Sequence, residues 1–386
     1  MPAARRPHLA SPSPTRAANV GEELQIADRK AEHITIASQQ DVEPGISASW
    51  NDVVLIHNCL PEIDLDEVNL SVEFLGRNLA APLLISSMTG GHELARSINA
   101  VLAEVAQRFG LAMGVGSQRA YIKDPSLADT YAVVRNAAPS AYVIANVGAP
   151  QLIQQSGEKP LTTEQVRQVM DLVRADALAV HLNYLQEMVQ PEGDTRSRGV
   201  LAAIRGVVAA VGVPVIAKET GAGIAPAQAA QLRDAGVQAL DVGGLGGTSF
   251  AIVEAERARL HDRQAKADLG ELFGAWGIPT MAAIPLACEV GLPVIGSGGV
   301  RSGLDAARAL ALGATLVGVA RPLLVVAQQG VDATAAWIEH FLDELRTALF
   351  LTGSRTPADL RGKAILLGRT KEWVEGLRAS SRIGAL

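Results

Sequence analysis

The chain has 386 residues, of which 48% are hydrophobic, so it is long enough to bury a large core. Its formal net charge of −6 argues against nucleic acid or an anionic membrane surface as a partner. The two cysteines, Cys59 and Cys288, form neither a disulfide framework nor a zinc motif, and we expect a reducing, cytoplasmic location. No apolar run is long enough to span a membrane, and residues 1–20 contain no apolar stretch typical of a secretory signal.

The first eighty or so residues precede any regular alternation of strands and helices. Residues 1–20 predict a flexible tail, and residues 21–80 predict an N-terminal arm that caps a barrel. Within the arm we expect a helix over Glu22–Ser38 and a β-hairpin or extended segment over Val53–Leu79. Helical spacing places Arg29 and His33 on one face with Lys30 beside it. A solvated basic face is the alternative interpretation of this cluster.

From Pro82 onward, a short apolar strand, a loop of small or polar residues and an amphipathic helix recur. The predicted strands are Leu83–Ser86, Ala112–Gly116, Tyr142–Ala145, Ala177–His181, Val213–Ala217, Ala239–Val242, Val294–Gly296 and Leu316–Val319. The predicted helices are His92–Phe109, Leu127–Ala137, Thr163–Arg174, Arg198–Val211, Pro226–Ala235, Ala282–Val290, Leu304–Leu312 and Ala333 to about Leu351.

Apolar strands that alternate with helices predict parallel pairing with both faces of the sheet covered. Eight such units predict an α/β fold, a (β/α)8 TIM barrel over residues 81–351, followed by a C-terminal extension over 352–386. An open doubly wound sheet is disfavoured, because no Gly-x-Gly-x-x-Gly motif opens the first unit.

Two longer segments follow strands at the predicted carboxyl-terminal end of the barrel, Glu187–Ser197 and Arg257–Ile278. Barrel enzymes keep their chemistry at this end, so we expect these segments to cover or line a substrate pocket. By contrast, the charged run Glu254–Lys266 predicts a solvated helix face.

Glycine-rich turns follow the sixth and seventh strands, within Asp241–Phe250 and Ile295–Gly303. Glycine lets the backbone approach a ligand closely, and the N–H groups at a following helix start favour an anion. These turns predict a phosphate-bearing ligand, whose phosphate would lie near Gly298, Gly299 and the backbone of Ala320.

Polar residues follow nearly every predicted strand, which packing alone would not require. Donors and acceptors suited to a flat heterocycle are Ser87, Met88, Thr89, Ser117 and Asn146. Lys218 would favour an anionic reduced flavin, although a Schiff-base or structural lysine is the alternative. A second group suited to a diphosphate comprises Arg29, Lys30, Gln118, Arg119, Gln186 and Glu187, with His181 and Asn183 in support. Glu187 fits a magnesium ligand better than a general base, with an exposed structural glutamate as the alternative.

With these residues in place, the chain resembles the type 2 isopentenyl diphosphate isomerases, an FMN-dependent family. The resemblance extends from Arg29 to about Leu367. It rests on motifs in the same order on the expected strand ends: Arg-Lys-x-x-His at 29–33, Met-Thr-Gly-Gly at 88–91, Gly-Ser-Gln-Arg at 116–119, Ala-Asn-Val-Gly at 145–148, His-Leu-Asn-x-x-Gln-Glu at 181–187, Lys-Glu at 218–219, Gly-Gly-Thr-Ser at 246–249 and Ser-Gly-Gly-Val-Arg at 297–301.

The resemblance implies a redox-neutral 1,3-allylic proton shift between isopentenyl and dimethylallyl diphosphates, with reduced FMN as cofactor, Mg2+ on the diphosphate and NADPH as the flavin reductant. It also implies a homo-oligomer, a tetramer or octamer. The implied substrate contacts are Arg29, Lys30, His33, Ser117, Gln118, Arg119 and Gln186, and the implied metal ligand is Glu187. The implied FMN contacts are Ser87, Met88, Thr89, Ser117, Asn146, Lys218, Thr248, Gly298, Gly299, Val300, Ala320 and Arg321. Proton transfer at the flavin would be supported by His181, Asn183, Gln186 and Lys218.

The chain departs from the family pattern at three positions. Gly243 stands where the family commonly has serine, Thr220 where it has valine, and Arg321 where a small or apolar residue is usual. These departures bear on flavin contacts and affinity more than on the fold.

Two rival functions remain open. An FMN-dependent 2-hydroxy-acid oxidase or dehydrogenase uses a similar barrel, but typically carries Ser-Asn-His-Gly-Gly-Arg near strand six, where this chain reads Val-Gly-Gly-Leu-Gly-Gly at 242–247. A catalytically silent flavin- or phosphate-binding barrel would not need Arg29, Lys30, Gln186 and Glu187.

Overall fold

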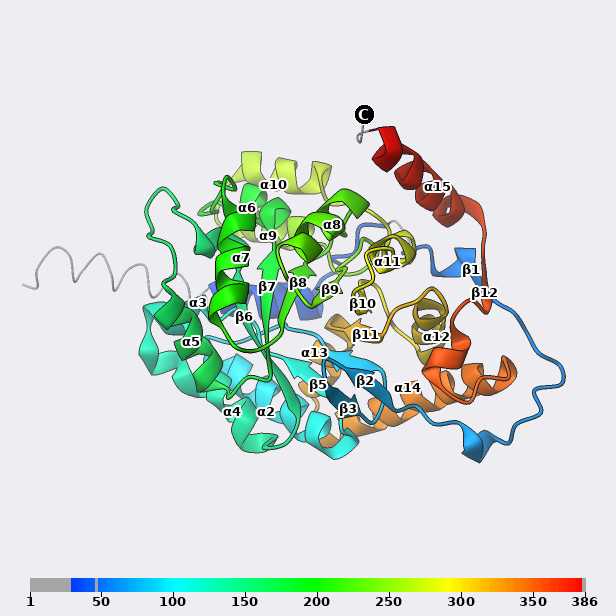
Figure 1. Ribbon diagram of the computed structural model, residues 1–386. Coiled ribbons are helices and arrows are strands. Elements are labelled where there is room, and N and C mark those ends of the chain that lie inside the picture. Colours follow the sequence, from blue (N-terminus) through cyan, green and yellow to red (C-terminus); the bar gives the residue numbers. More distant parts are fainter. Residues whose placement is uncertain (1–28, 46–47, 384–386) are drawn as a thin grey trace, which may run out of the picture.

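A closed barrel of parallel strands forms the centre of the protein (Figure 1). The computed structural model describes residues 29–45 and 48–383. Around the barrel the strands follow the order β10-β11-β4-β5-β6-β7-β8-β9. Their bounds are β4 (Leu83–Ile85), β5 (Ala112–Gly114), β6 (Tyr142–Gly148), β7 (Ala177–Leu182), β8 (Val215–Glu219), β9 (Ala239–Asp241), β10 (Val294–Ser297) and β11 (Leu316–Val319). The predicted (β/α)8 fold is confirmed, with every predicted barrel strand present.

Helices surround the barrel at the predicted places. They are α2 (Glu93–Phe109), α4 (Asp129–Ala137), α5 (Thr163–Leu172), α7 (Val200–Ala210), α8 (Pro226–Asp234), α11 (Thr280–Cys288), α12 (Gly303–Ala311) and α14 (Val331–Leu351). Local chemistry sets their ends, as α2 illustrates: the His92 side chain accepts the N–H of Leu94, and Gly110 ends the helix at a φ of 62°.

Further helices stand at the carboxyl-terminal end of the barrel, where the sequence predicted loops or insertions. They are α3 (Arg119–Lys123), α6 (Tyr184–Val189), α9 (Phe250–Leu260), α10 (Gln264–Leu272) and α13 (Arg321–Ala327). A further helix covers residues 29–39, so the predicted N-terminal helix is present from residue 29, whereas its predicted start at Glu22 and the predicted tail over 1–20 lie outside the described residues.

The N-terminal arm contributes to two separate small sheets. Strands β2 (Val72–Phe74) and β3 (Arg77–Leu79) form an antiparallel hairpin, and Phe74 and Leu79 pack against the first inward-facing residues of the barrel strands. The hairpin therefore plugs the amino-terminal end of the barrel and leaves the opposite end free for a site.

The prediction of one hairpin or extended segment over Val53–Leu79 holds only for its second half. Strand β1 (Val53–Leu55) pairs with β12 (Ala364–Leu366), more than three hundred residues later. The N-terminal arm and the C-terminal extension thus meet in one two-stranded sheet, from which α15 (Gly368–Ile383) continues along the periphery of the molecule (Figure 1). Among the described helices, none has the length and apolar character needed to cross a membrane.

Candidate active site

The carboxyl-terminal end of the barrel contains a cavity of about 1200 Å³, including the space open to solvent. A second cavity of about 670 Å³ shares Lys218, Thr248 and Ala320 with it, so the two form one elongated site. Almost all of the predicted site residues line one or both: Arg29, Lys30, His33, Ser87, Met88, Thr89, Ser117, Arg119, Asn146, His181, Asn183, Gln186, Glu187, Lys218, Thr248, Gly298, Gly299, Val300, Ala320 and Arg321.

Gln118 is the exception among the predicted substrate contacts. Its side chain is fully buried, where its Nε2 donates to the carbonyl of Val169 at 2.7 Å and its Oε1 accepts the N–H of Asn146 at 3.0 Å. A side chain whose polar atoms are already used between two barrel segments is not free to bind a ligand. The predicted substrate contact of Gln118 does not fit this structure, and its observed role is to fix the end of β6.

One end of the elongated site is built from glycine turns. Gly298 and Gly299 have φ values of 113° and 77°, and a Cβ on Gly299 would lie 2.3 Å from the carbonyl oxygen of Gly246. Only glycine fits such a backbone, and its use brings the main chain to the cavity wall without a side chain in between.

Lys218 lies between the two ends of the site and is already paired. Its Nζ is 2.9 Å from Asp241 Oδ2, and Asp241 also accepts a hydrogen bond from the Ser297 hydroxyl. Because Asp241 is buried, this ion pair holds the ammonium in one place. The lysine therefore presents an oriented cation whose charge is shared with a carboxylate, in contrast to the lone cation expected from the sequence.

His181 is held by Asn146 at a distance of 2.8 Å between its Nδ1 and Asn146 Oδ1. The Asn146 Nδ2 donates to the carbonyl of Val115, so Oδ1 is the acceptor and we assign the imidazole proton to Nδ1. Burial, with the nearby charges of Lys30 and Lys218, lowers the pKa of His181 to about 3. The ring is therefore neutral, and Nε2 is left as an acceptor.

The other end of the site is cationic. Arg29 and Lys30 project from the N-terminal helix, and Arg119 begins α3. Among the described residues, neither an ion pair nor a hydrogen bond is recorded for the Lys30 ammonium, and the buried Nε atoms of both arginines lack partners. Burial and the neighbouring Arg29 and Arg119 lower the pKa of Lys30 to about 8. An anion placed here would relieve the repulsion among the three cations.

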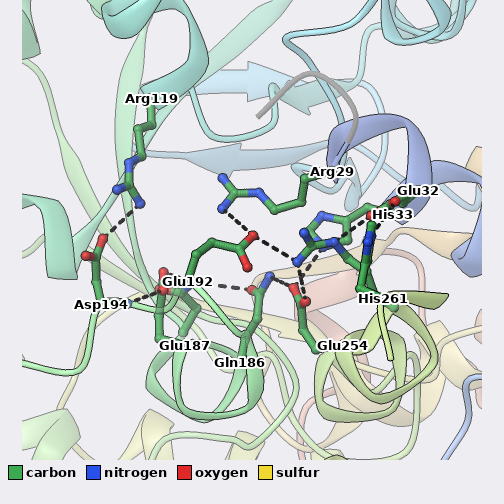
Figure 2. A network of polar contacts seen from close by, with 12 residues as sticks. Arg29, Glu32, His33, Arg119, Gln186, Glu187, Glu192, Asp194, Glu254 and His261 are labelled. Carbon is green, nitrogen blue, oxygen red and sulfur yellow. Dashed lines mark hydrogen bonds and ion pairs between the residues drawn. The ribbon is translucent and has the colours of Figure 1, made fainter. Parts of the chain in front are cut away.

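A buried carboxylate, Glu254 of α9, joins the N-terminal helix to the barrel (Figure 2). It accepts hydrogen bonds from Gln186 Nε2 at 3.0 Å and from Arg257 Nη1 at 3.1 Å, and it lies 2.8 Å from His33 Nε2. Burial alone would raise its pKa, but His33, Arg257 and Gln186 together hold the pKa well below its usual range. Glu254 thereby fixes two residues that line the cavity, His33 and Gln186.

This position corrects the prediction that Glu254–Lys266 is a solvated helix face. The Glu254 side chain is 0% exposed, and Arg257 is nearly buried as well. A sequence signal was present, because Glu254 is the one charged residue in the otherwise apolar stretch Phe250–Ala255. An isolated carboxylate within an apolar stretch is rarely buried without a partner.

Comparisons with known proteins agree on the fold and on the family. Residues 163–367 match the family model described as FMN-dependent dehydrogenase. An isopentenyl-diphosphate delta-isomerase of Thermoplasma volcanium is 47% identical over 351 residues, with 91% of this chain and 99% of that protein covered. The protein of the same name from Methanoregula boonei is 45% identical over 352 residues, covering 90% and 96%. The chain belongs to the type 2 isopentenyl-diphosphate delta-isomerase family.

Solved structures outside this isomerase family share its barrel. A mandelate oxidase aligns with a TM-score of 0.59 and 20% identity, covering 90% of this chain and 100% of the other. A Pediococcus acidilactici protein named as a lactate oxidase aligns with a TM-score of 0.63 and 18% identity, covering 91% and 94%. At this identity the likeness establishes the fold alone.

The structure explains the first departure from the isomerase pattern. Gly243 has a φ of 45°, and a Cβ at this position would lie 2.1 Å from the carbonyl oxygen of Glu219. The turn after β9 therefore has no room for serine at this position. The facing turn is fixed by Glu219, whose Oε2 accepts backbone N–H groups from Thr220 through Gly223.

Arg321, another of the three departures, holds the N-terminal segment of this isomerase-family chain in place. Its guanidinium donates to the carbonyls of Ala37 at 2.8 Å and Gln40 at 2.9 Å, and to Glu43 at 3.0 Å. Arg301 also pairs with Glu43. The arginine therefore lines the glycine end of the site while it holds the segment that follows Arg29, Lys30 and His33.

Glu187, the predicted metal ligand, lines the cavity. Its side chain is nearly buried, accepting from Asn183 Nδ2 at 2.9 Å and from the Asp194 N–H at 2.8 Å. Burial raises the pKa of Glu187, although these two hydrogen bonds oppose the effect. A bound cation would offset the free-energy cost of burying the charged carboxylate. No group of three or more His, Cys, Asp or Glu side chains among the described residues has a metal-binding arrangement. A cation held by Glu187 would thus need oxygen ligands from a substrate or from water.

Proposed function

We propose that this chain interconverts isopentenyl and dimethylallyl diphosphate by a 1,3-allylic proton shift, with reduced FMN in the glycine-lined end of the site and Mg2+ on the substrate diphosphate. The family supplies the reaction class. The two chemically different ends of one elongated site support the arrangement of substrate and cofactor.

The observation that carries the proposal is the cationic end of the site. Lys30 lines the cavity together with Arg29 and Arg119, its pKa is lowered, and its ammonium lacks a partner among the described residues, which is costly unless an anion binds there. A diphosphate offers several oxygens to these groups, and each charge-assisted hydrogen bond contributes about 1.5–3 kcal/mol. The apolar tail of the substrate would then extend towards His181 and Lys218 at the centre of the cavity.

Mg2+ fits the pair of Glu187 and the bound diphosphate. This cation prefers one or two carboxylates together with phosphate oxygens and water, and Glu187 supplies one carboxylate at the cavity wall. Asn183 would orient that carboxylate, and its own Oδ1 is buried without a partner, which leaves it free to accept a hydrogen bond from a metal-bound water.

The residues at the other end fit FMN. The hydroxyls of Ser86 and Thr89 are buried at the cavity wall and have no hydrogen-bond partner within the part of the chain that the structure describes, as expected for groups that bind a polar ligand. The phosphate would lie against Gly298, Gly299 and Val300, and the ring against Ser87, Met88, Thr89, Ser117 and Asn146, with Thr248, Ala320 and Arg321 along the edge. When bound, reduced FMN supplies the group that gives and accepts the proton.

The side chains of this chain would orient the substrate and control charge. Neutral His181 offers Nε2 as an acceptor and adds no positive charge beside Lys218. Lys218, held by Asp241, would stabilise an anionic reduced cofactor. Gln186 lines the cavity in a fixed orientation, because its Nε2 donates to Glu254. Burial raises the pKa of Glu219 to about 7, but its Oε2 is held by the backbone N–H groups of residues 220–223, in agreement with a cofactor that carries the proton shift.

A flavin assay separates the proposal from the oxidase alternative. The purified chain is loaded with oxidised FMN, and its visible spectrum is followed without oxygen after 2-hydroxy acids or isopentenyl diphosphate are added. The proposal predicts no bleaching by the acids, and formation of dimethylallyl diphosphate once dithionite has reduced the flavin. Rapid bleaching by a 2-hydroxy acid would instead support the oxidoreductase.

A further inference from the structure

The loop that links α6 to α7 reaches over the cationic end of the site with two carboxylates (Figure 2). Glu192 Oε1 lies 3.3 Å from Arg29 Nη1, and Asp194 Oδ2 lies 2.8 Å from Arg119 Nη1. Carboxylate and phosphate oxygens accept the same charge-assisted hydrogen bonds from guanidinium groups. The two arginines assigned to the diphosphate are therefore already occupied by acidic side chains of the chain itself.

The two carboxylates are held very differently. The Asp194 side chain is 12% exposed, accepts from Gln151 Nε2 at 3.0 Å, and belongs to a residue whose N–H donates to Glu187. The Glu192 side chain is 41% exposed. Glu192 is consequently the carboxylate that can move, whereas Asp194 is part of the frame around Glu187.

Glu192 has a second cation to which it can remain bound. Its Oε1 lies 2.9 Å from Arg257 Nη1, closer than to Arg29. Arg257 is itself anchored by Glu32 at 2.7 Å and by buried Glu254 at 3.1 Å. If Arg29 turned to a phosphate oxygen, Glu192 would keep Arg257, and no charge would be left unpaired.

Arg29 has no second carboxylate among the described residues: its other neighbour is the neutral Gln190 amide, whose oxygen, with the amide oriented to satisfy its contacts, accepts from Arg29 Nη1 at 3.0 Å. Within the described part of the chain, Glu192 is the one carboxylate that forms an ion pair with Arg29. Arg119, by contrast, pairs with both Asp194 and Glu158. Displacement of Glu192 therefore frees one arginine for a ligand, whereas loss of Asp194 would leave Arg119 bound to Glu158.

We propose that Glu192 is a placeholder for a phosphate oxygen, which occupies Arg29 in the ligand-free chain and is displaced by the substrate diphosphate. This inference rests on the proposed function, because it takes Arg29 as a diphosphate contact. The placeholder keeps the cationic end of the site organised before substrate arrives, and it makes substrate binding weaker than the bare cations would allow. Glu192 is thus a determinant of substrate affinity that does not itself bind the substrate.

Titration calorimetry with inorganic pyrophosphate tests the placeholder on the full-length, FMN-loaded chain in the presence of Mg2+. Glu192→Gln is expected to bind pyrophosphate about two- to fivefold more tightly, the factor that corresponds to a partly exposed ion pair. Glu289→Gln is the control, because Glu289 is similarly exposed and pairs with Arg378 outside the site. Asp194→Asn makes the same charge change in the same loop and is expected to give no gain in affinity.

A double variant distinguishes the loss of the Glu192–Arg29 ion pair from a general effect of charge. In Arg29→Gln, the further change Glu192→Gln should no longer tighten pyrophosphate binding, because the competition for Arg29 is gone. In the parent background, KM for isopentenyl diphosphate should fall by the factor seen in calorimetry, with kcat unchanged.

Three results would overturn the placeholder. The first is a Glu192→Gln variant that binds pyrophosphate no more tightly than the parent chain. The second is an equal increase in affinity in Asp194→Asn, and the third is an increase that persists when Arg29→Gln is also present. Conversion of isopentenyl diphosphate is measured on the same preparations. Turnover without a gain from Glu192→Gln refutes the placeholder alone, whereas absence of turnover by the parent chain refutes the proposed function.

Discussion

Lys30 provides the most informative single substitution. Lys30→Met keeps the length of the side chain and removes the ammonium that shares the cavity with Arg29 and Arg119. The loss of one charge-assisted contact to the diphosphate, about 1.5–3 kcal/mol, raises KM for isopentenyl diphosphate roughly 10- to 150-fold. Because the ammonium binds the diphosphate and not the reacting carbons, kcat should change little.

The same substitution should stabilise the ligand-free protein. A pKa lowered from 10.5 to about 8 means that the protonated form is disfavoured in the folded state. Below pH 8 the amine is protonated in both folded and unfolded chains, so this cost is fully present there, and it is removed as the pH rises from about 8 to the unfolded value. Because a pKa shift of one unit corresponds to 1.36 kcal/mol, the protonated amine lowers the free energy of unfolding by an amount on the order of 3 kcal/mol. Lys30→Met should therefore raise the ligand-free Tm by a few degrees at pH 7.

Steady-state kinetics and thermal unfolding of the same preparations test both effects. Lys371→Met is the matched control, because Lys371 is exposed on α15 and loses only a surface pair with Glu375. A rise in KM together with a rise in Tm is a signature that a purely structural lysine would not give. A KM within about twofold of the parent, or a lowered Tm, would refute the anion site at Lys30.

Further substitutions test other parts of the site. Glu254→Gln should lower stability by about 1.5–3 kcal/mol in urea unfolding and reduce turnover, because Arg257 and His33 lose charge-assisted contacts to a buried carboxylate while Arg257 keeps Glu32; unchanged stability would contradict the network. Gly243→Ser should weaken FMN retention in fluorescence titrations, because its Cβ would lie 2.1 Å from a carbonyl oxygen, and intact retention would show that the turn can shift. Arg321→Ala should expose residues 37–43 to limited proteolysis, with Arg346→Ala as a surface control. Substrate affinity should decline as the pH rises above about 8, where Lys30 loses its proton in the free enzyme, and this decline should be absent from Lys30→Met.

The barrel was predictable because its signal is local. Each strand is a short apolar run, and each helix repeats an apolar face, so the order of elements follows from the periodicity and the parallel sheet follows from the order. The pairing of β1 with β12 was not predictable in this way. Val53 and Leu366 are far apart in the sequence, and nothing near either residue indicates its partner.

The site was predictable to the extent that it lies at strand ends. Parallel strands bring their carboxyl ends together, which placed His181, Lys218 and Gly298 in one cavity from topology alone. Two features required coordinates. Gln118 follows a strand as the others do, yet its side chain turns into the wall. The apolar stretch around Glu254 indicated a buried carboxylate, but its partners His33 and Gln186 lie far away in the sequence and could not be read from it.

The central claim is that a reduced flavin in this cavity mediates proton exchange on an isoprenoid diphosphate. An anaerobic NMR assay in D2O tests it most directly, with the chain, FMN, dithionite, Mg2+ and isopentenyl diphosphate, and with oxidised flavin as the control. The account predicts deuterated dimethylallyl diphosphate with reduced flavin and none with oxidised flavin. Turnover with oxidised flavin, or no turnover by a folded chain that retains reduced flavin, would contradict it.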